Sequence, residues 1–224
     1  MSRCIIIAPL YAGEDAEWLR RGEGDFLICA DGGYDAAVRC GLKPDPTVGD
    51  FDSMPFTHVR EGDVLRLPAY KDDTDMVVCL KEGRRRGYRS FRMAGCLGGR
   101  LDHTIANLQC LYDCALRGEE AWMTDGRNRV TVLCPGQYTL PYRPGCKLSL
   151  LAFTEKAEGV CLRGTEWELE NAVLTSRYPL GTSNEITAPA AELSFTAGAV
   201  TVVYAKDDTF VTMSQNPTEI APST

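Results

Sequence analysis

The sequence lacks the features that mark membrane, secreted and nucleic-acid-binding proteins. No run of about eighteen apolar residues occurs in the 224-residue chain, and the apolar start at residues 4–8 is cut off by Pro9. We therefore expect neither a transmembrane helix nor a signal peptide. The formal net charge of -7 disfavours a phosphate-backbone partner, because nucleic-acid binding depends on clustered Lys and Arg. These absences predict a cytoplasmic protein that contacts neither membrane nor nucleic acid.

Histidine and paired cysteine are also scarce. His58 and His103 are the two histidines of the chain, too few for a histidine-rich metal site and a weak basis for a Ser-His-Asp triad. The 10 cysteines occur singly, without a C-x-x-C pair, so we expect reduced thiols in the core and neither disulfides nor zinc. With 44% hydrophobic and 25% charged residues, the composition is that of an ordinary globular protein.

The first half of the chain alternates apolar runs with helical patterns, which is typical of strand-helix-strand units around a parallel sheet. A helix is clearest after Arg100, where apolar residues recur at three- and four-residue spacing until Gly118. The sequence predicts strands at residues 4–8, 26–30, 63–67 and 90–94, and helices at 34–40, 76–80 and 101–115.

After residue 126 the pattern changes to short strands and turns. The predicted strands are residues 130–133, 138–140, 148–153, 160–162, 166–169, 193–195 and 200–204, while 181–185 reads as a loop. We therefore predict two domains. Residues 1–126 form an α/β domain with a mainly parallel sheet, and residues 127–224 form an all-β sandwich.

Two carboxylates follow a predicted strand end in the stretch Val48-Gly49-Asp50-Phe51-Asp52-Ser53. In an extended segment Asp50 and Asp52 point to the same side. At about 4 Å and an effective dielectric near 20 they repel by roughly 4 kcal/mol, so the pair either stays solvated or binds a metal. The local pattern leaves a solvated turn and a metal site open.

Three further segments combine glycine, acid or arginine at a predicted helix start. Asp31-Gly32-Gly33 allows backbone N–H groups to approach an anion, although a plain strand-to-helix turn explains it equally well. Lys71-Asp72-Asp73-Thr74-Asp75 contains an N-cap at Asp73 or Thr74, with more acids than capping requires. Gly98-Gly99-Arg100 is suited to phosphate, and His103 reads as a first-turn residue satisfied by a carboxylate.

Taken in order, these motifs resemble the thiamine pyrophosphokinase family. Gly164-Thr165-Glu166-Trp167-Glu168-Leu169 and Gly181-Thr182-Ser183-Asn184-Glu185 extend the resemblance over nearly the whole chain. It implies an α/β domain followed by a β-sandwich, and transfer of the pyrophosphoryl group of ATP to thiamine to give thiamine diphosphate and AMP. It also implies Mg²⁺ as cofactor and a homodimer whose active site is shared between chains.

The resemblance assigns roles residue by residue. The implied catalytic acids are Asp50, Asp52, Asp75 and Asp102, with Mg²⁺ on Asp50, Asp52 and Asp75. The implied nucleotide-binding residues are Asp31, Gly32, Gly33, Lys71, Asp72, Thr74 and Arg100, and the implied thiamine-binding residues are Trp167, Ser183 and Asn184. Tyr34-Asp35 and the segment after residue 7 depart from the family pattern, which leaves the adenosine contacts open.

The chemistry of phosphoryl transfer agrees with these implied roles but does not identify the general base. Phosphoryl-type transfer needs positioning and charge neutralisation more than a nucleophilic side chain. Asp75 and Asp102 are both candidates for the general base. Two alternatives remain open: another Mg²⁺-dependent phosphohydrolase or nucleotidyl transferase that uses the same acids, and a non-catalytic sensor of thiamine or nucleotide. A plain core or interface role for Trp167 also remains open.

Overall fold

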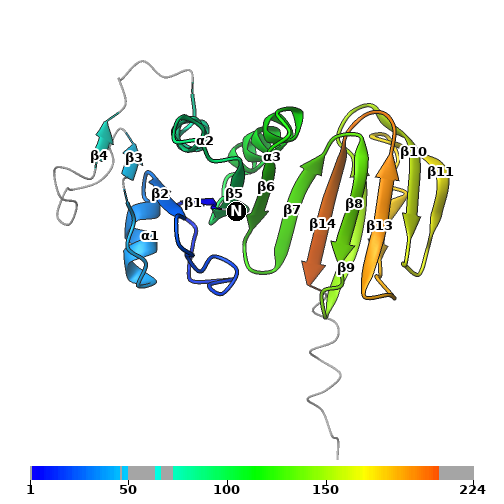
Figure 1. The fold of residues 1–224 in the computed structure, drawn as a ribbon, viewed down its shortest axis with the longest axis horizontal. Helices are drawn as coiled ribbons and strands as arrows, with labels where there is room; N and C mark the ends of the chain where they lie inside the picture. The colour runs from blue at the N-terminus through cyan, green and yellow to red at the C-terminus, as the bar shows by residue number, and fades with distance from the viewer. Residues whose placement is uncertain (1, 46, 50–63, 67–72, 207–224) are drawn as a thin grey trace, which may run out of the picture.

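The fold was analysed in a computed structural model that describes residues 2–45, 47–49, 64–66 and 73–206. An α/β half and an all-β half lie side by side along the long axis of the molecule (Figure 1). Four of the predicted site residues, Asp50, Asp52, Lys71 and Asp72, lie outside the described residues. Their roles therefore stay predictions.

Six strands of the α/β half form the parallel part of a large sheet. Each of the five neighbouring pairs runs parallel, in the order β6-β5-β1-β2-β3-β4. β1 and β2 are buried along their whole length, as expected for strands covered on both faces. The bounds are β1 (Cys4–Ile7), β2 (Phe26–Ala30), β3 (Thr47–Gly49), β4 (Val64–Arg66), β5 (Ser90–Ala94) and β6 (Glu120–Thr124).

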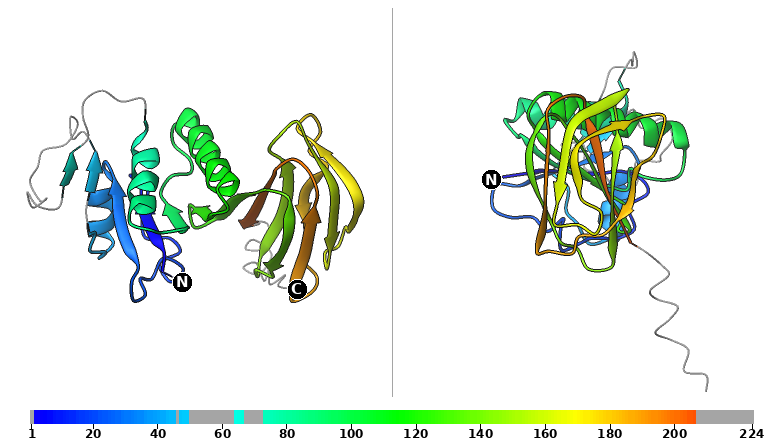
Figure 2. Two further views of the ribbon diagram at one scale, coloured as in Figure 1. Left: turned by 45° about the horizontal axis from the view of Figure 1, so that its top comes forward. Right: turned by 90° about the vertical axis from the view of Figure 1, so that its right-hand side faces the viewer.

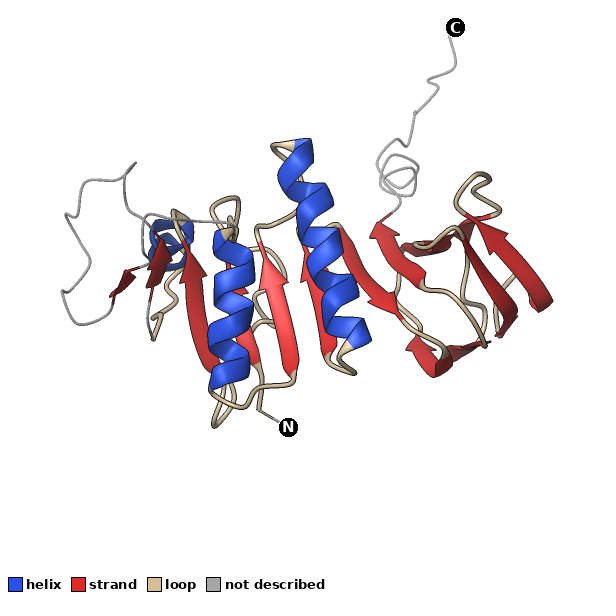
Figure 3. Cartoon of the chain, turned by 90° about the horizontal axis from the view of Figure 1, so that it is seen from above, coloured by secondary structure: helices blue, strands red, loops and turns tan. Residues whose placement is uncertain are grey.

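Helices cover both faces of these strands. α1 (Gly33–Arg39) lies on one face, and α2 (Asp75–Arg85) and α3 (Leu101–Leu116) lie on the other (Figures 1 and 3). The alternation of side chains along β1 explains both contacts. Ile5 belongs to the core cluster that includes Ala36 of α1, whereas Ile6 belongs to the cluster that includes Leu80 of α2.

The expectation of a mainly parallel sheet was wrong for the sheet as a whole, which is mixed. Beyond β6 it continues without a break into four antiparallel strands, in the order β6-β7-β14-β9-β12. Residues 125–127 alone join β6 to β7, and a connection this short can only reverse the chain. The bounds are β7 (Asn128–Leu133), β9 (Cys146–Ala152), β12 (Gly181–Asn184) and β14 (Val200–Lys206).

A second sheet packs against this antiparallel part and completes a sandwich (Figures 1 and 2). Leu148, Leu150 and Val202 of the first sheet share a core with Leu193 and Phe195 of the second. The strands of the second sheet, in the order β11-β10-β13-β8, are β8 (Gly136–Pro141), β10 (Lys156–Arg163), β11 (Leu169–Thr175) and β13 (Ala190–Phe195). The all-β half that the sequence predicts is present, and the boundary at residue 126 stays a prediction.

Two local predictions in the all-β half were wrong. Residues 166–168 form a loop that leads into β11, and the expected loop at 181–184 is the edge strand β12. β12 lacks the apolar alternation that reveals a strand, and it pairs with β9 through a register shift between Gly181 and Asn184. All ten cysteines are free thiols. Within the described residues, no helix is long and apolar enough to cross a membrane.

Gly33 marks the tightest contact between α1 and the sheet. A Cβ at this position would lie 2.1 Å from the carbonyl oxygen of Ile7, which belongs to the backbone of β1 and cannot move aside. We predict that Gly33→Ala lowers the free energy of unfolding by about 1–3 kcal/mol, the usual cost of overpacking. Urea denaturation measures the change. Gly22→Ala is the matched control, because its Cβ would make an ordinary 3.7 Å contact with Asp25. Equal stability of the two variants would contradict the prediction.

Candidate functional site

A pocket of about 440 Å³ opens where β1, β2 and β5 end. Its walls come from the segments that follow these three strands and from the first turns of α2 and α3. In open α/β sheets, the crevice at the carboxyl ends of the strands is the usual place for a ligand. We call this pocket the acidic pocket, because Asp31, Asp73 and Asp75 line it.

Asp31 carries two signs of a specialised position. It adopts a left-handed backbone conformation, with φ of 44°, which non-glycine residues adopt at an energetic cost. Its Oδ1 atom is buried and accepts no hydrogen bond within the described part of the chain. A buried carboxylate oxygen without a donor is costly. Both features suit a residue whose partner arrives with a ligand.

In the segment before α2, one residue caps the helix and its two neighbours line the pocket with carboxylates. Thr74 is the N-cap, since its Oγ1 accepts a hydrogen bond from the Val77 N–H at 3.4 Å. Asp73 pairs with Lys81 at 2.5 Å. Of the two N-cap candidates, the structure therefore selects Thr74. Asp75 occupies the first turn of α2, where the helix dipole favours its negative charge.

The segment before α3 brings arginine and carboxylate together at the mouth of the acidic pocket. Gly98 and Gly99 adopt positive φ angles of 86° and 63°, which permit the sharp turn before Arg100. The Arg100 guanidinium donates to both oxygens of Asp102, at 2.6 and 3.1 Å, and both side chains are exposed. These hydrogen bonds lower the pKa of Asp102 and keep it ionised. The His103 N–H also donates to Asp102, at 2.9 Å, and the His103 side chain lines the pocket.

Asn107 is a pocket residue that the sequence reasoning missed. It lines the acidic pocket from α3, and its buried amide donates to the Cys96 carbonyl at 2.8 Å. This bond ties the loop after β5 to the helix. The available signal was a polar residue spaced three and four positions from the buried Cys110 and Leu111.

The described residues alone do not complete a metal site. They contain no group of three or more His, Cys, Asp and Glu side chains placed to hold a metal ion. Asp50 and Asp52, which carry the metal prediction together with Asp75, lie outside the described residues. The predicted metal set thus stays a prediction.

The three residues predicted to bind thiamine lie together at the far edge of the all-β half. The Trp167 side chain is 59% exposed on the loop before β11, which disfavours a core role within one chain. The buried Asn184 side chain holds that loop: its Oδ1 accepts from the Trp167 N–H at 3.0 Å, and its Nδ2 donates to the Trp167 carbonyl at 2.7 Å. Ser183 is exposed, with φ of 61°. Asn184 therefore fixes the position of the indole.

Within one chain, this edge is far from the acidic pocket. Asn184 belongs to β12, and five strands separate β12 from β1 in the sheet. Six spacings of about 4.8 Å place the two sites roughly 29 Å apart. Figure 1 shows the same separation, with β1 and β2 in the left half and β10 and β11 at the right end.

Comparison with known families gives matches to both halves of the chain. The thiamin pyrophosphokinase catalytic domain matches residues 22–123, and the vitamin B1 binding domain of thiamin pyrophosphokinase matches residues 137–200. The chain belongs to the thiamine pyrophosphokinase family. It is thus an enzyme of the class that makes thiamine diphosphate by pyrophosphoryl transfer. The acidic pocket falls in the catalytic match except for Ala8, Pro9 and Leu10, and the Trp167 loop falls in the vitamin-binding match.

Individual thiamine pyrophosphokinases cover the same length of chain. The chain is 27% identical over 191 residues to the thiamine pyrophosphokinase of Bacillus subtilis, which spans 83% of this chain and 89% of that one. The crystal structure of Bacillus subtilis thiamine pyrophosphokinase superposes with a TM-score of 0.81 at 24% identity, covering 92% of this chain and 100% of that one. The Geobacillus thermodenitrificans enzyme gives 0.79 at 28% identity, covering 93% and 99%.

The hydrogen bonds of Asn184 generate a stability prediction. Asn184→Ala removes the acceptor for the Trp167 N–H and one of the two donors to the Trp167 carbonyl, which keeps the Thr165 hydroxyl, so the free energy of unfolding should fall by about 1–3 kcal/mol. Chemical denaturation measures the loss. Ser183→Ala is the control, because the hydrogen bond found for Ser183 uses its backbone N–H, which donates to Ser149. If both variants unfolded at the same denaturant concentration, Asn184 would not hold the loop.

Proposed function

We propose that this chain transfers the pyrophosphoryl group of ATP to the hydroxyethyl oxygen of thiamine, giving thiamine diphosphate and AMP. The observation that supports this proposal most is that the two expected parts of the site, for the nucleotide and for thiamine, lie in different halves of the chain. An acidic pocket suited to a nucleotide lies in the catalytic match, and an exposed indole held by Asn184 lies in the vitamin-binding match.

The ends of two helices give the acidic pocket its affinity for phosphate. The first turns of α2 and α3 both line it, and the N-terminus of a helix favours anions through free N–H groups and the helix dipole. Arg100 is exposed and placed to exchange Asp102 for phosphate oxygens, which its fork-shaped guanidinium can bind in pairs. Gly32 and Gly33 open α1 beside Asp31 and would allow close approach of the nucleotide.

Mg²⁺ is the cofactor we propose for this pocket. Mg²⁺ prefers oxygen ligands, and it is usually held by one or two carboxylates and the substrate phosphates. Asp75, Asp50 and Asp52 would hold the ion, and the unpartnered Oδ1 of Asp31 fits the same donor chemistry. When bound, the ion would neutralise phosphate charge. Lys71, Asp72 and Thr74 precede α2 and would contribute to the nucleotide half of the site.

The proton of the thiamine hydroxyl needs an acceptor, and the acidic pocket offers two. Asp75 lines the pocket directly, whereas Asp102 would be released when Arg100 turns to phosphate. A carboxylate within hydrogen-bond reach can act as the general base. We keep both residues as candidates.

Thiamine carries a cationic thiazolium ring, which suits the Trp167 loop. An indole face attracts a cation, and desolvation by the bound substrate strengthens that attraction. Ser183 lies one residue from Asn184 and would add a hydroxyl to the vitamin site. We assign Asn184 to positioning Trp167, since both of its hydrogen bonds with that residue are to backbone atoms.

A homodimer would bring the two halves of the site together. The hydrogen-bonded sheet keeps the Trp167 loop roughly 29 Å from the acidic pocket of its own chain. A two-fold dimer presents each pocket to the partner's all-β half, so that two shared sites form at once. Cytoplasmic location stays a prediction, and the ten free thiols agree with a reducing compartment.

The product of ATP cleavage separates the proposed reaction from its alternatives. Incubated with ATP, Mg²⁺ and thiamine, the protein should form AMP and thiamine diphosphate in equal amounts, measured by ion-exchange chromatography. ADP or free phosphate as the product would indicate another phosphotransferase or a phosphohydrolase. Binding of both substrates without AMP formation would indicate a sensor. Asp75→Asn provides the inactive control.

Trp167 should act on thiamine more than on ATP. Loss of the indole face costs roughly 1–2 kcal/mol, so Trp167→Ala should raise the thiamine KM about tenfold and leave the ATP KM nearly unchanged. Steady-state kinetics with each substrate varied in turn measures the effect. Trp167→Phe, which keeps an aromatic ring, should recover most of the affinity. A proportional increase in both KM values would remove Trp167 from the thiamine site.

Subunit exchange tests whether the site is shared between chains. An inactive Asp31→Asn protein mixed with an impaired Trp167→Ala protein should regain activity, because one site of each mixed dimer contains no substitution. Random pairing makes about half the dimers mixed, so recovery should approach roughly a quarter of normal activity.

The matched control mixes Asp31→Asn with Asp75→Asn. Both substitutions lie in the acidic pocket, so every site in those dimers keeps one of them. Both mixtures are assayed at thiamine concentrations well below the KM of Trp167→Ala. If the first mixture gained nothing beyond the residual activity of Trp167→Ala while mixed dimers were present, the two halves would come from the same chain.

A further inference from the structure

A second cavity, of about 580 Å³, lies beneath the junction of the two halves. Arg92 of β5 and Trp122 of β6 line it, whereas the adjacent Met93 and Met123 belong to the core cluster on the opposite face of the sheet, which includes residues of α2 and α3. β8 of the second sheet and the loop that carries Trp18 form its other walls. None of its lining residues belongs to the acidic pocket.

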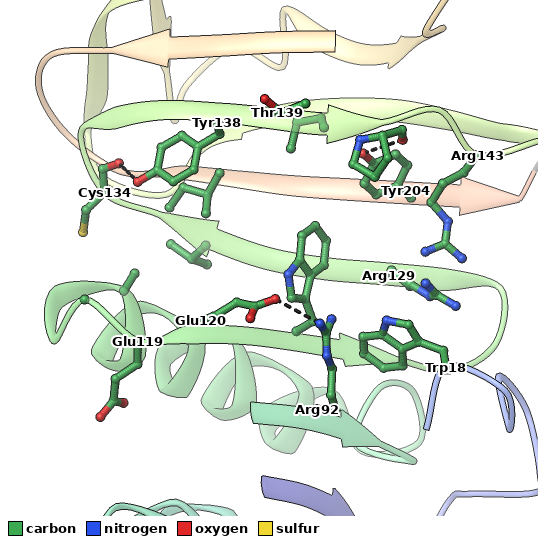
Figure 4. Close-up of a pocket in the computed structure, with 17 residues that line it drawn as sticks. Trp18, Arg92, Glu119, Glu120, Arg129, Cys134, Tyr138, Thr139, Arg143 and Tyr204 are labelled. Carbon is green, nitrogen blue, oxygen red and sulfur yellow. Dashed lines mark hydrogen bonds and ion pairs between the residues drawn. The ribbon is translucent and has the colours of Figure 1, made fainter. Parts of the chain in front are cut away.

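Three arginines line this cavity: the guanidinium groups of Arg129 and Arg143 lie near each other at one end, and that of Arg92 lies on the other side of Trp18, beside Glu120 (Figure 4). The Cζ atoms of Arg92 and Arg129 lie 4.6 and 4.5 Å from the Trp18 ring, and Arg143 lies 5.5 Å from the Tyr204 ring. We call this group the arginine cluster. Each of its guanidinium groups therefore makes a cation–π contact with an aromatic ring.

Carboxylates neutralise the arginine cluster only in part. Arg92 pairs with Glu120 at 3.0 Å, and Arg129 pairs with Asp15 at 2.8 Å. Arg143 forms no ion pair with any carboxylate of the described residues. Burial, and then the neighbouring Arg129, lower the pKa of Arg143, while Cys146 and Asp15 act in the opposite direction.

The remaining acid of the cavity does not supply the missing charge. Glu119 lies at the other end, away from the arginine cluster, and pairs with Arg84 at 2.8 Å (Figure 4). Of the three arginines, Arg92 and Arg129 each form an ion pair with a carboxylate, and Arg143 forms none within the described part of the chain. The Nε of Arg92 is buried and donates no hydrogen bond among the described residues, so the cluster also lacks a hydrogen-bond acceptor.

The aromatic residues that line the cavity favour a ligand that itself carries an aromatic ring. Trp122 and Tyr204 stand 6.1 Å apart between ring centroids, and Tyr138 lies further along the same cavity (Figure 4). A volume of this size holds a small organic ligand. Inorganic phosphate would satisfy the arginines but would leave the aromatic surface uncovered.

We propose that this second cavity binds a nucleoside monophosphate, with its phosphate at the arginine cluster and its base against the aromatic lining. A phosphate accepts several hydrogen bonds and offers the negative charge that Arg143 lacks. The base would pack on Trp122 and Tyr138, which line the cavity and are only partly buried. The site is separate from the acidic pocket and does not depend on the proposed reaction.

Tryptophan fluorescence can report on this cavity alone. The chain has 3 tryptophans, and Trp18 and Trp122 both line the cavity. In full-length Trp167→Phe protein the emission therefore comes from the cavity. AMP, titrated without ATP or thiamine, should quench it saturably with a Kd below about 1 mM. Adenosine and inorganic phosphate should each bind at least about tenfold more weakly, because each lacks one half of the recognised group.

Substitutions in the Trp167→Phe background locate the signal. Arg143→Gln should weaken AMP binding about tenfold, and Arg143→Lys, which keeps the charge and loses the planar fork, should weaken it less. Arg177→Gln, an exposed position outside the cavity, should change nothing. Arg100→Gln should also leave the quench intact, since it alters the acidic pocket.

Four results would overturn the proposal. They are no saturable quench up to about 10 mM AMP, equal affinity in both Arg143 variants and their parent, binding of phosphate as tight as that of AMP, and loss of the quench in Arg100→Gln. No turnover takes place in the titration, so failure of the proposed reaction would leave this result unaffected.

Discussion

The hydrogen-bonded continuity of the ten-stranded sheet is the constraint on which the rest of the structure depends. β6 and β7 pair directly across the junction of the two halves, with Met123 opposite Val130 and Thr124 opposite Arg129. Asp125 closes the turn by accepting from the N–H groups of Arg127 and Asn128, at 2.9 and 2.6 Å. A junction built from ladder hydrogen bonds resists bending, so one half cannot fold over the other. The sheet thereby separates the acidic pocket from the Trp167 loop of the same chain.

Asp15 strengthens this junction from outside the sheet. Its carboxylate accepts from the Thr124 hydroxyl at 2.7 Å and from Arg129 at 2.8 Å, one residue on each of the paired strands. The loop that carries Asp15 also carries Trp18, whose ring contacts Arg92 and Arg129. The elements that stiffen the junction thus also form the wall of the second cavity. A ligand there would bind to both halves of the chain.

Much of the α/β half could be predicted from the sequence, because its signals are local. Buried parallel strands read as short apolar runs, and the period of the helix after Arg100 reflects one face packed on the sheet. Polar residues and glycines at strand ends and helix starts likewise mark Asp31, Asp75 and Arg100, which the fold brings to one pocket. The mixed sheet could not be predicted in this way, because β14 pairs with β7 and with β9, and it lies far from both in the sequence.

The direction in which each side chain of the site points could not be predicted from the sequence. Trp167, Ser183 and Asn184 were expected to line a vitamin pocket, and they do lie together, yet Asn184 is buried and holds the Trp167 backbone. The sequence predicts a loop at β12 because Gly-Thr-Ser-Asn has no apolar alternation, and in this short edge strand only Asn184 is buried. The arginine cluster left no sequence signal, since Arg92, Arg129 and Arg143 come from three separate elements or turns.

We propose that each active site takes its acidic pocket from one chain and its Trp167 loop from another. The most direct test is the rate of AMP formation per chain, measured over a dilution series in which mass photometry follows the dissociation of dimers. The account predicts that the rate per chain falls in proportion to the fraction of dimer, and that it recovers on reconcentration. A rate per chain that stayed constant while the protein became monomeric would contradict it.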